Sequence, residues 1–178
     1  MSMEHKAFIF DYQSFIKELA NILDEALKTG ENEALIDFIE ENVAFLKDPY
    51  EGEPLDASWK EIIEIEDVNQ YGDFALTKFY NPQEDIGLSY DWETLQELLQ
   101  SEGLKQDIVL GEVFGSEDNC FDPGKQGSYF QSSEQVNKNL QFINNLIKRK
   151  PEVASELGEL VEMLQQASEV QKGLYITF

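Results

Sequence analysis

The stretch AFIFDYQSFIKELANILDEAL, residues 7–27, changes its pattern of apolar residues partway along. The first four residues, 7–10, form a short apolar run, which is typical of a buried strand. From Asp11 onward, apolar residues recur every three or four positions as far as Leu27. This spacing places them on one face of an amphipathic helix. A strand that leads directly into a helix indicates a chain that mixes both kinds of element.

Helical spacing dominates the rest of the chain. After a stop at Gly30, a residue that commonly ends helices, it resumes and gives a first predicted helical hairpin over about residues 11–46. Ser132, with Gln135 three positions later, has the pattern of a capping box. It opens a second predicted hairpin over about residues 132–167. Shorter helices are expected to begin at Asp56, around Tyr71 and at Asp91, and Trp59 and Trp92 are expected in the core.

Four short strands are predicted, over about residues 6–10, 86–90, 107–114 and 173–178. A chain of 178 residues is long enough to bury one sizeable core. We therefore expect an α+β fold, richer in helix than in strand, in which residues 1–178 form a single domain with a small sheet.

The composition is strongly acidic. There are 36 Asp and Glu against 13 Lys and Arg, a net charge of −23 at pH 7. Hydrophobic residues make up 42% of the chain, too many for a disordered polyacid. Such a charge repels nucleic-acid phosphates, and the sequence has no long apolar run or basic amphipathic stretch. Neither nucleic acid nor a membrane is therefore an expected partner.

The negative charge is concentrated in the first two thirds of the sequence. Residues 61–122 hold 16 acids and two bases, a net charge of −14, whereas residues 123–178 hold six of each. Twelve of the aromatic residues also fall between Tyr50 and Phe130. Because aromatic residues anchor interfaces and acids attract cations, this part of the chain is expected to carry the recognition surface.

Residue types that carry common catalytic chemistry are scarce. The one histidine, His5, lies in an N-terminal segment expected to be mobile, and the one cysteine, Cys120, lies among acids that disfavour a reactive thiolate. They make no zinc cluster, catalytic triad or disulfide framework. No catalytic residue, cofactor or metal site is assigned, and an enzyme is the less favoured class.

Calcium is the metal alternative that the sequence leaves open. Asp118 and Asp122 occupy the first and fifth positions of a calcium-loop pattern, but Cys120, Pro123 and Tyr129 stand at three of its defining positions. A weak divalent site formed by residues 117, 118 and 122 competes with the simpler interpretation of a solvated acidic loop.

The segment from Gly111 to Gln131 carries four glycines and several aromatic residues, without helical or strand periodicity. Long irregular segments in compact domains are often functional. Its aromatics either pack down onto the core or contact a partner. The residues expected to contact a partner, here and near the second tryptophan, are Glu117, Asp118, Phe121, Asp122, Tyr129, Phe130, Tyr90 and Asp91.

These observations favour a non-catalytic acidic protein, a regulator, inhibitor or immunity-type protein that binds a basic protein partner. One alternative is a small-molecule-binding protein or enzyme with a cleft near Gly111–Phe130. Another is a protein that mimics DNA with an acidic surface. The first six residues lack the apolar core of a signal peptide, so a cytoplasmic location is expected.

Overall fold

A three-stranded antiparallel sheet lies at the centre of the computed structural model, which describes residues 2–104 and 107–178. Its strands are β1 (Lys6–Phe10), β2 (Ser128–Gln131) and β3 (Gly173–Thr177), in the order β1-β3-β2. The last strand of the chain therefore lies between the other two. The register pairs Tyr175 with both Phe8 and Phe130.

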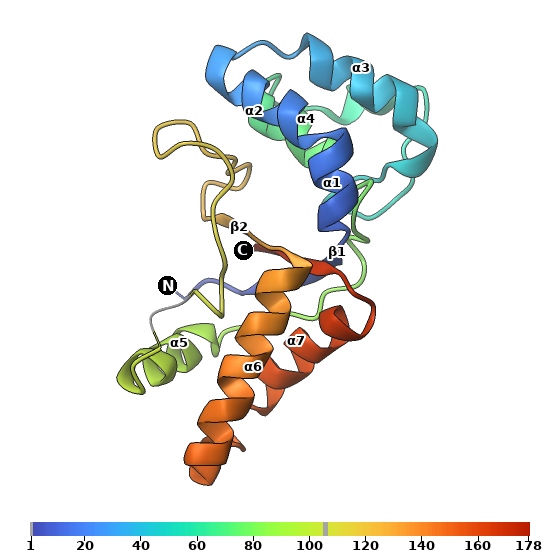
Figure 1. The fold of residues 1–178 in the computed structure, drawn as a ribbon. Coiled ribbons are helices and arrows are strands. Elements are labelled where there is room, and N and C mark those ends of the chain that lie inside the picture. Colours follow the sequence, from blue (N-terminus) through green and yellow to red (C-terminus); the bar gives the residue numbers. More distant parts are fainter. Residues whose placement is uncertain (1, 105–106) are drawn as a thin grey trace.

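Both faces of this sheet are buried. Side chains alternate between the faces along a strand, so Phe8, Phe10 and Tyr175 enter one core while Ala7 and Ile176 enter the other. Figure 1 shows the consequence: helices α1 to α4 lie over one face, and α6 and α7 lie over the opposite face. The result is an α+β fold in three layers.

The first core is covered by four helices from the N-terminal part of the chain: α1 (Tyr12–Glu18), α2 (Ala20–Thr29), α3 (Glu33–Asn42) and α4 (Val68–Leu76). The predicted hairpin over residues 11–46 is confirmed. Its first helix is divided at Leu19, whose φ of −121° departs from helical geometry. Gly30 ends α2 in the left-handed conformation, as predicted.

The second core is covered by α5 (Trp92–Ser101), α6 (Ser133–Arg149) and α7 (Gly158–Glu169). The hairpin predicted over residues 132–167 is confirmed, as is its capping box. The Ser132 hydroxyl accepts from the Gln135 N–H at 3.1 Å, and the Gln135 side chain accepts from the Ser132 N–H at 2.7 Å. None of the helices in the described residues is long and apolar enough to cross a membrane.

Two of the predicted strands are absent from the sheet. Residues 86–90 run beside β1, but the Asp85 carboxylate takes the N–H of Ala7 at 3.0 Å and Ser89 adopts a positive φ, so pairing is limited to one bridge at His5. Residues 107–114 fail as a strand because Gly111 has a φ of 106°, which leaves a single bridge between Glu112 and Phe130.

The third strand of the sheet is instead β2, which lies in the segment from Gly111 to Gln131 that was expected to be irregular. The helix expected from Asp56 is also shorter than predicted, a single 3₁₀ turn over Trp59–Ile62. Trp59 and Trp92 both lie in the core, as predicted.

Candidate functional site

A cavity of about 230 Å³ lies where β1 and β3 meet the end of α4 and three loops that contain proline. We call it the Asp73 cavity. The residues of its lining that bear on its chemistry are Lys6, Tyr50, Asp73, Tyr80, Asp85 and Tyr175. It combines a carboxyl group with aromatic walls at the boundary between the sheet and the N-terminal helices.

Helix α4 places Asp73 inward. The carboxylate of Asp67 accepts the N–H of Gln70 at 2.8 Å and so caps the start of the helix. Every residue from Tyr71 to Leu76 is buried, and Asp73 is only 5% exposed. The carboxyl group is therefore held inside the protein by a helix whose whole second half is packed.

The loop over residues 47–54 forms the outer wall and carries Tyr50. The Thr77 hydroxyl accepts the Lys47 N–H at 2.9 Å, which joins this loop to the end of α4. Gly52 has a φ of 75°, and a Cβ at that position would overlap the side chain of Gln83. Only glycine accommodates both the positive φ and the closeness of Gln83 without strain. Gly52 therefore allows the loop to pack closely onto the turn after Tyr80.

The electrostatics of the cavity are unusual. Burial raises the pKa of Asp73 from 3.8 to about 7, although a hydrogen bond from the Tyr50 hydroxyl acts in the opposite direction. Burial also raises the pKa of Tyr50 to about 12 and that of Tyr80 well above its ordinary value. These phenols therefore stay protonated at neutral pH, while Asp73 lies near the midpoint of its titration.

Further acids lie at the opening of the cavity. Asp48 and Glu64 both raise the pKa of Tyr50 through their negative charges, and Asp85 lines the cavity. Lys6 is the cationic side chain of the lining. It takes part in none of the ion pairs that the described residues form within 4 Å. The cavity thus has a net negative environment.

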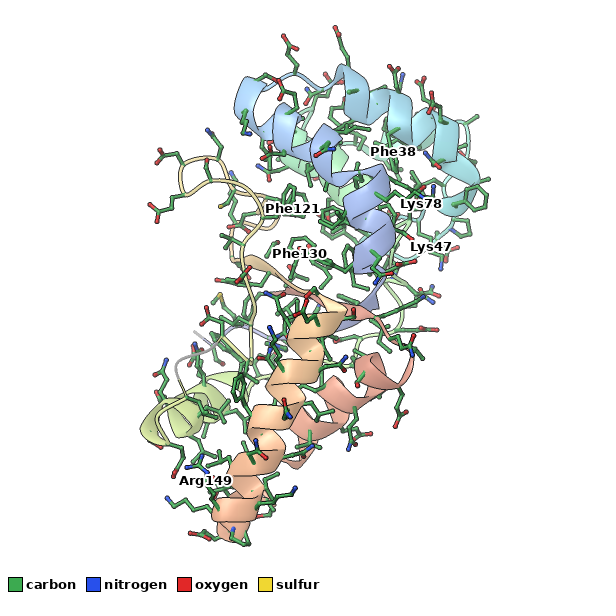
Figure 2. The ribbon with its side chains drawn as sticks, viewed as in Figure 1. Phe38, Lys47, Lys78, Phe121, Phe130 and Arg149 are labelled. Atoms are coloured by element: carbon green, nitrogen blue, oxygen red, sulfur yellow. The ribbon has the colours of Figure 1, made fainter. Side chains whose placement is uncertain are left out.

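The structure places two of the expected contact residues out of reach of a partner. Phe121 and Phe130 are fully buried beneath the N-terminal helices, and Figure 2 shows both side chains in the core above the sheet. The Phe130 ring stacks on that of Phe15, with centroids 5.5 Å apart. Tyr129, on the opposite face of β2, is half-buried against Phe178. The aromatics of this segment therefore pack onto the core.

The remaining expected contact residues are accessible but do not form one site. Glu117 and Asp118 are exposed at the tip of the loop that lies beside α2 and α4, whereas Tyr90 and Asp91 are exposed at the start of α5, on the other side of the sheet (Figure 1). Asp122 is half-buried and holds the loop together, because its carboxylate accepts the Gly127 N–H at 3.0 Å.

No group of three or more His, Cys, Asp or Glu side chains that could hold a metal ion is found in residues 2–104 and 107–178. The divalent alternative at residues 117, 118 and 122 therefore has no preformed ligand set in the structure.

His5 is not in a mobile segment, contrary to expectation. It is 1% exposed, and its Nε2 lies 2.9 Å from the Val109 carbonyl oxygen. Its Nδ1 accepts the Leu88 N–H at 3.1 Å. Both ring nitrogens are thus used in holding the structure together, and burial lowers the pKa of the imidazole. The histidine is unavailable as a general base.

No family model, curated protein or solved structure matches the chain.

The Asp73 cavity was missed at the level of sequence, where only the apolar residues of this helix were considered. The available signal was a single acid inside the otherwise apolar run from Tyr71 to Leu76. A buried acid in such a run requires an explanation, because ionised groups are rarely buried without a partner.

Proposed function

We propose that this protein is a non-catalytic acidic binding protein, a regulator or inhibitor of the immunity type, that recognises a basic protein partner. The observation that carries the proposal is the surface of residues 61–67, here called the acidic segment. Glu61, Glu64, Glu66 and Asp67 are all exposed in it. Ile62 and Ile65, between them, are 45% and 54% exposed.

Exposed apolar side chains surrounded by acids suit an interface with a cationic surface. The apolar groups supply area to bury, while the carboxylates steer the partner and fix its orientation. The 3₁₀ turn that begins at Trp59 ends at Ile62 and leaves this side chain facing solvent.

The distribution of the lysines adds support. Five of them already form ion pairs with acids of the same chain: Lys28 with Asp24, Lys60 with Glu40, Lys78 with Glu18, Lys138 with Glu134 and Lys150 with Glu102. Their charges are therefore largely compensated within the protein. The excess carboxylates are left to interact with solvent ions or with a partner.

The commitment of His5 to two structural hydrogen bonds favours a binding role over acid–base catalysis. It removes the side chain whose ordinary pKa is best matched to proton transfer at neutral pH.

The test begins with capture of binding proteins from the native host, followed by purification of each candidate and direct measurement of its dissociation constant. We expect a basic partner whose affinity falls at least about tenfold between ~50 and ~400 mM NaCl, because salt screens charge attraction. An affinity that does not change with salt contradicts the proposal.

Two variants locate the interface. Ile62→Ser with Ile65→Ser should weaken binding by about tenfold or more, since the few residues at the centre of an interface that dominate its affinity cost about 2 kcal/mol or more when truncated. Val170→Ser is the matched control, because Val170 is 53% exposed but lies in the charge-balanced third of the chain. Equal effects of the two changes contradict an interface at the acidic segment.

A further inference from the structure

Asp73 is a buried carboxyl group with no cationic partner in the described part of the chain. Its side chain is 5% exposed, yet it takes part in none of the ion pairs formed within 4 Å by residues 2–104 and 107–178. The Tyr50 hydroxyl lies close enough to the carboxyl group to lower its pKa in part. Lys6 also lines the cavity, but it forms no ion pair with Asp73 among the described residues. A buried carboxylate is costly without a counter-ion, so a cation that reaches Asp73 through the cavity would be stabilised there.

The walls of the cavity suit the same kind of ligand. The Tyr80 ring lies against Tyr175 with centroids 5.2 Å apart and against Phe8 with centroids 5.0 Å apart. Tyr50 adds a third tyrosine at the opening. Aromatic rings attract cations through their negative faces, and a cation among several rings beside a carboxylate is held by both kinds of interaction.

The size of the cavity limits the ligand. About 230 Å³ holds roughly seven water molecules at ~30 Å³ each. It is smaller than the ~300–1,000 Å³ typical of sites for drug-sized ligands. A nucleotide or an oligosaccharide is therefore too large to be enclosed, whereas the end of one long side chain fits.

The charges around the opening select the sign of the ligand. Asp85 lines the cavity, and the charges of Asp48 and Glu64 act on Tyr50 at its edge, whereas Lys6 is the one ammonium in the lining. Glu64 belongs to the acidic segment, and its charge reaches Tyr50 at the edge of the cavity. A cation attracted by that segment arrives next to the cavity.

We propose that the Asp73 cavity binds one alkylammonium or guanidinium group, supplied by a lysine or arginine side chain of the basic partner. The identity of the supplier rests on the proposed function, but the cation site itself rests on the cavity. Asp73 forms the ion pair, the three tyrosines enclose the alkyl stem and the cationic head, and the acids at the opening attract it.

The proposal implies a dependence on pH. The charged and titratable groups that face Asp73 or the cavity are Lys6, Asp48, Tyr50, Glu64, Tyr80, Asp85 and Tyr175. Of these, the three tyrosines have raised pKa values and stay neutral. Because the pKa of Asp73 is about 7, the carboxylate that the cation needs is about tenfold more abundant at pH 8 than at pH 6.

The experiment is an NMR titration of the full chain with n-butylammonium and n-propylguanidinium chloride at constant ionic strength. We expect saturable shifts at Tyr50, Asp73 and Tyr80, with dissociation constants on the order of millimolar, and about tenfold tighter binding at pH 8 than at pH 6. Neutral n-butanol should not bind. Absence of saturable shifts at these residues, or equal binding of butanol, overturns the proposal.

Variants separate charge from enclosure. Asp73→Asn should weaken amine binding at least tenfold and remove its pH dependence, whereas Glu159→Gln, an exposed change on α7, should leave both unchanged. Tyr50→Leu keeps the buried carboxyl and removes one aromatic wall, and it should weaken binding several-fold. Unfolding curves establish that each variant is folded. Unaltered binding in folded Asp73→Asn overturns the proposal even if Tyr50→Leu has an effect.

The outcomes also distinguish this inference from the proposed function. If a basic partner binds in a salt-sensitive manner but Asp73→Asn leaves its affinity unchanged, the cavity is not the subsite and this inference is wrong while the proposed function stands. If the amines bind at Asp73 but no basic protein does, the cation site stands with a free amine as ligand, and the proposed function is wrong.

Discussion

The Nε2 of His5 lies 2.9 Å from the carbonyl oxygen of Val109, 104 positions later in the chain. With Nδ1 accepting the Leu88 N–H, the ring is a neutral imidazole that carries its proton on Nε2. His5, directly before β1, thus connects the start of this strand to two irregular segments that the sheet does not include. The only histidine of the sequence is a structural connector.

Replacing His5 by alanine should lower the free energy of unfolding by about 3 kcal/mol. The change leaves the Leu88 N–H and the Val109 carbonyl without their partner, and each buried polar group left unpaired costs about 1–3 kcal/mol. Urea unfolding at pH 7 measures the effect. Glu4→Ala, an exposed neighbour, should change stability by less than about 0.5 kcal/mol. Equal stabilities of the two variants contradict the role assigned to His5.

The pH dependence of the same residue has a definite sign. Burial lowers the pKa of folded His5 below 6.5, so its contribution to stability is fully present above pH 6.5 and is lost as the pH falls through the lowered value. His5→Phe keeps the ring beside Trp92 and Phe178 but cannot titrate. The difference in stability between the protein and this variant should shrink between pH 7 and pH 4. A constant difference contradicts this titration.

Gly87 should tolerate no side chain. A Cβ there would overlap the backbone of His5 and lie 2.8 Å from the nitrogen of Ala7, so Gly87→Ala forces residues 85–89 away from β1. We expect a loss of about 2 kcal/mol, in the range of overpacking changes. Gly158→Ala is the control, because a Cβ at Gly158 meets open space within α7 and should be neutral or slightly stabilising. Thermal unfolding of both variants tests the contrast.

The sequence indicated the α+β class and both hairpins because these depend on local patterns. The apolar spacing of α6 and the Ser132–Gln135 capping box are properties of a few neighbouring residues, and the structure confirms them. The apolar run 7–10 likewise predicted β1 directly.

The errors lie where contacts between distant parts of the chain decide the outcome. Residues 107–114 have strand-like composition, but the positive φ of Gly111 and the single bridge of Glu112 depend on how β2 passes beside them. The Asp73 cavity is assembled from α4, β1, β3 and three loops, so spacing along the sequence did not reveal it. A lone acid in an apolar helix was the only local sign.

Added salt should raise the melting temperature. The net charge of −23 makes the folded chain repel itself, and residues 61–122, with a net charge of −14, contribute most of that repulsion. Raising NaCl from ~10 to ~300 mM shortens the screening length from about 30 Å to below about 8 Å. The exposed ion pairs, such as Lys28 with Asp24, contribute too little to reverse the gain. A melting temperature that stays flat or falls in calorimetry contradicts this balance.

Asp73 should make the protein less stable as the pH rises, opposite to the effect of His5. Its folded pKa of about 7 lies above the unfolded value of 3.8, so its contribution is fully present below about pH 3.8 and is lost as the pH rises through 7. Asp73→Asn keeps the shape and removes the titration. At pH 8 the variant should be more stable than the parent, by on the order of 4 kcal/mol, and the gain should vanish near pH 4. Asp118→Asn, exposed at the loop tip, should show little difference at either pH. Urea unfolding of all three proteins across pH 4 to 8 provides the measurement. If the stability gained by Asp73→Asn is the same at pH 4 and pH 8, Asp73 does not change its protonation between these values. The cavity would then lack the carboxylate, ionised above about pH 7, on which the proposed cation binding depends.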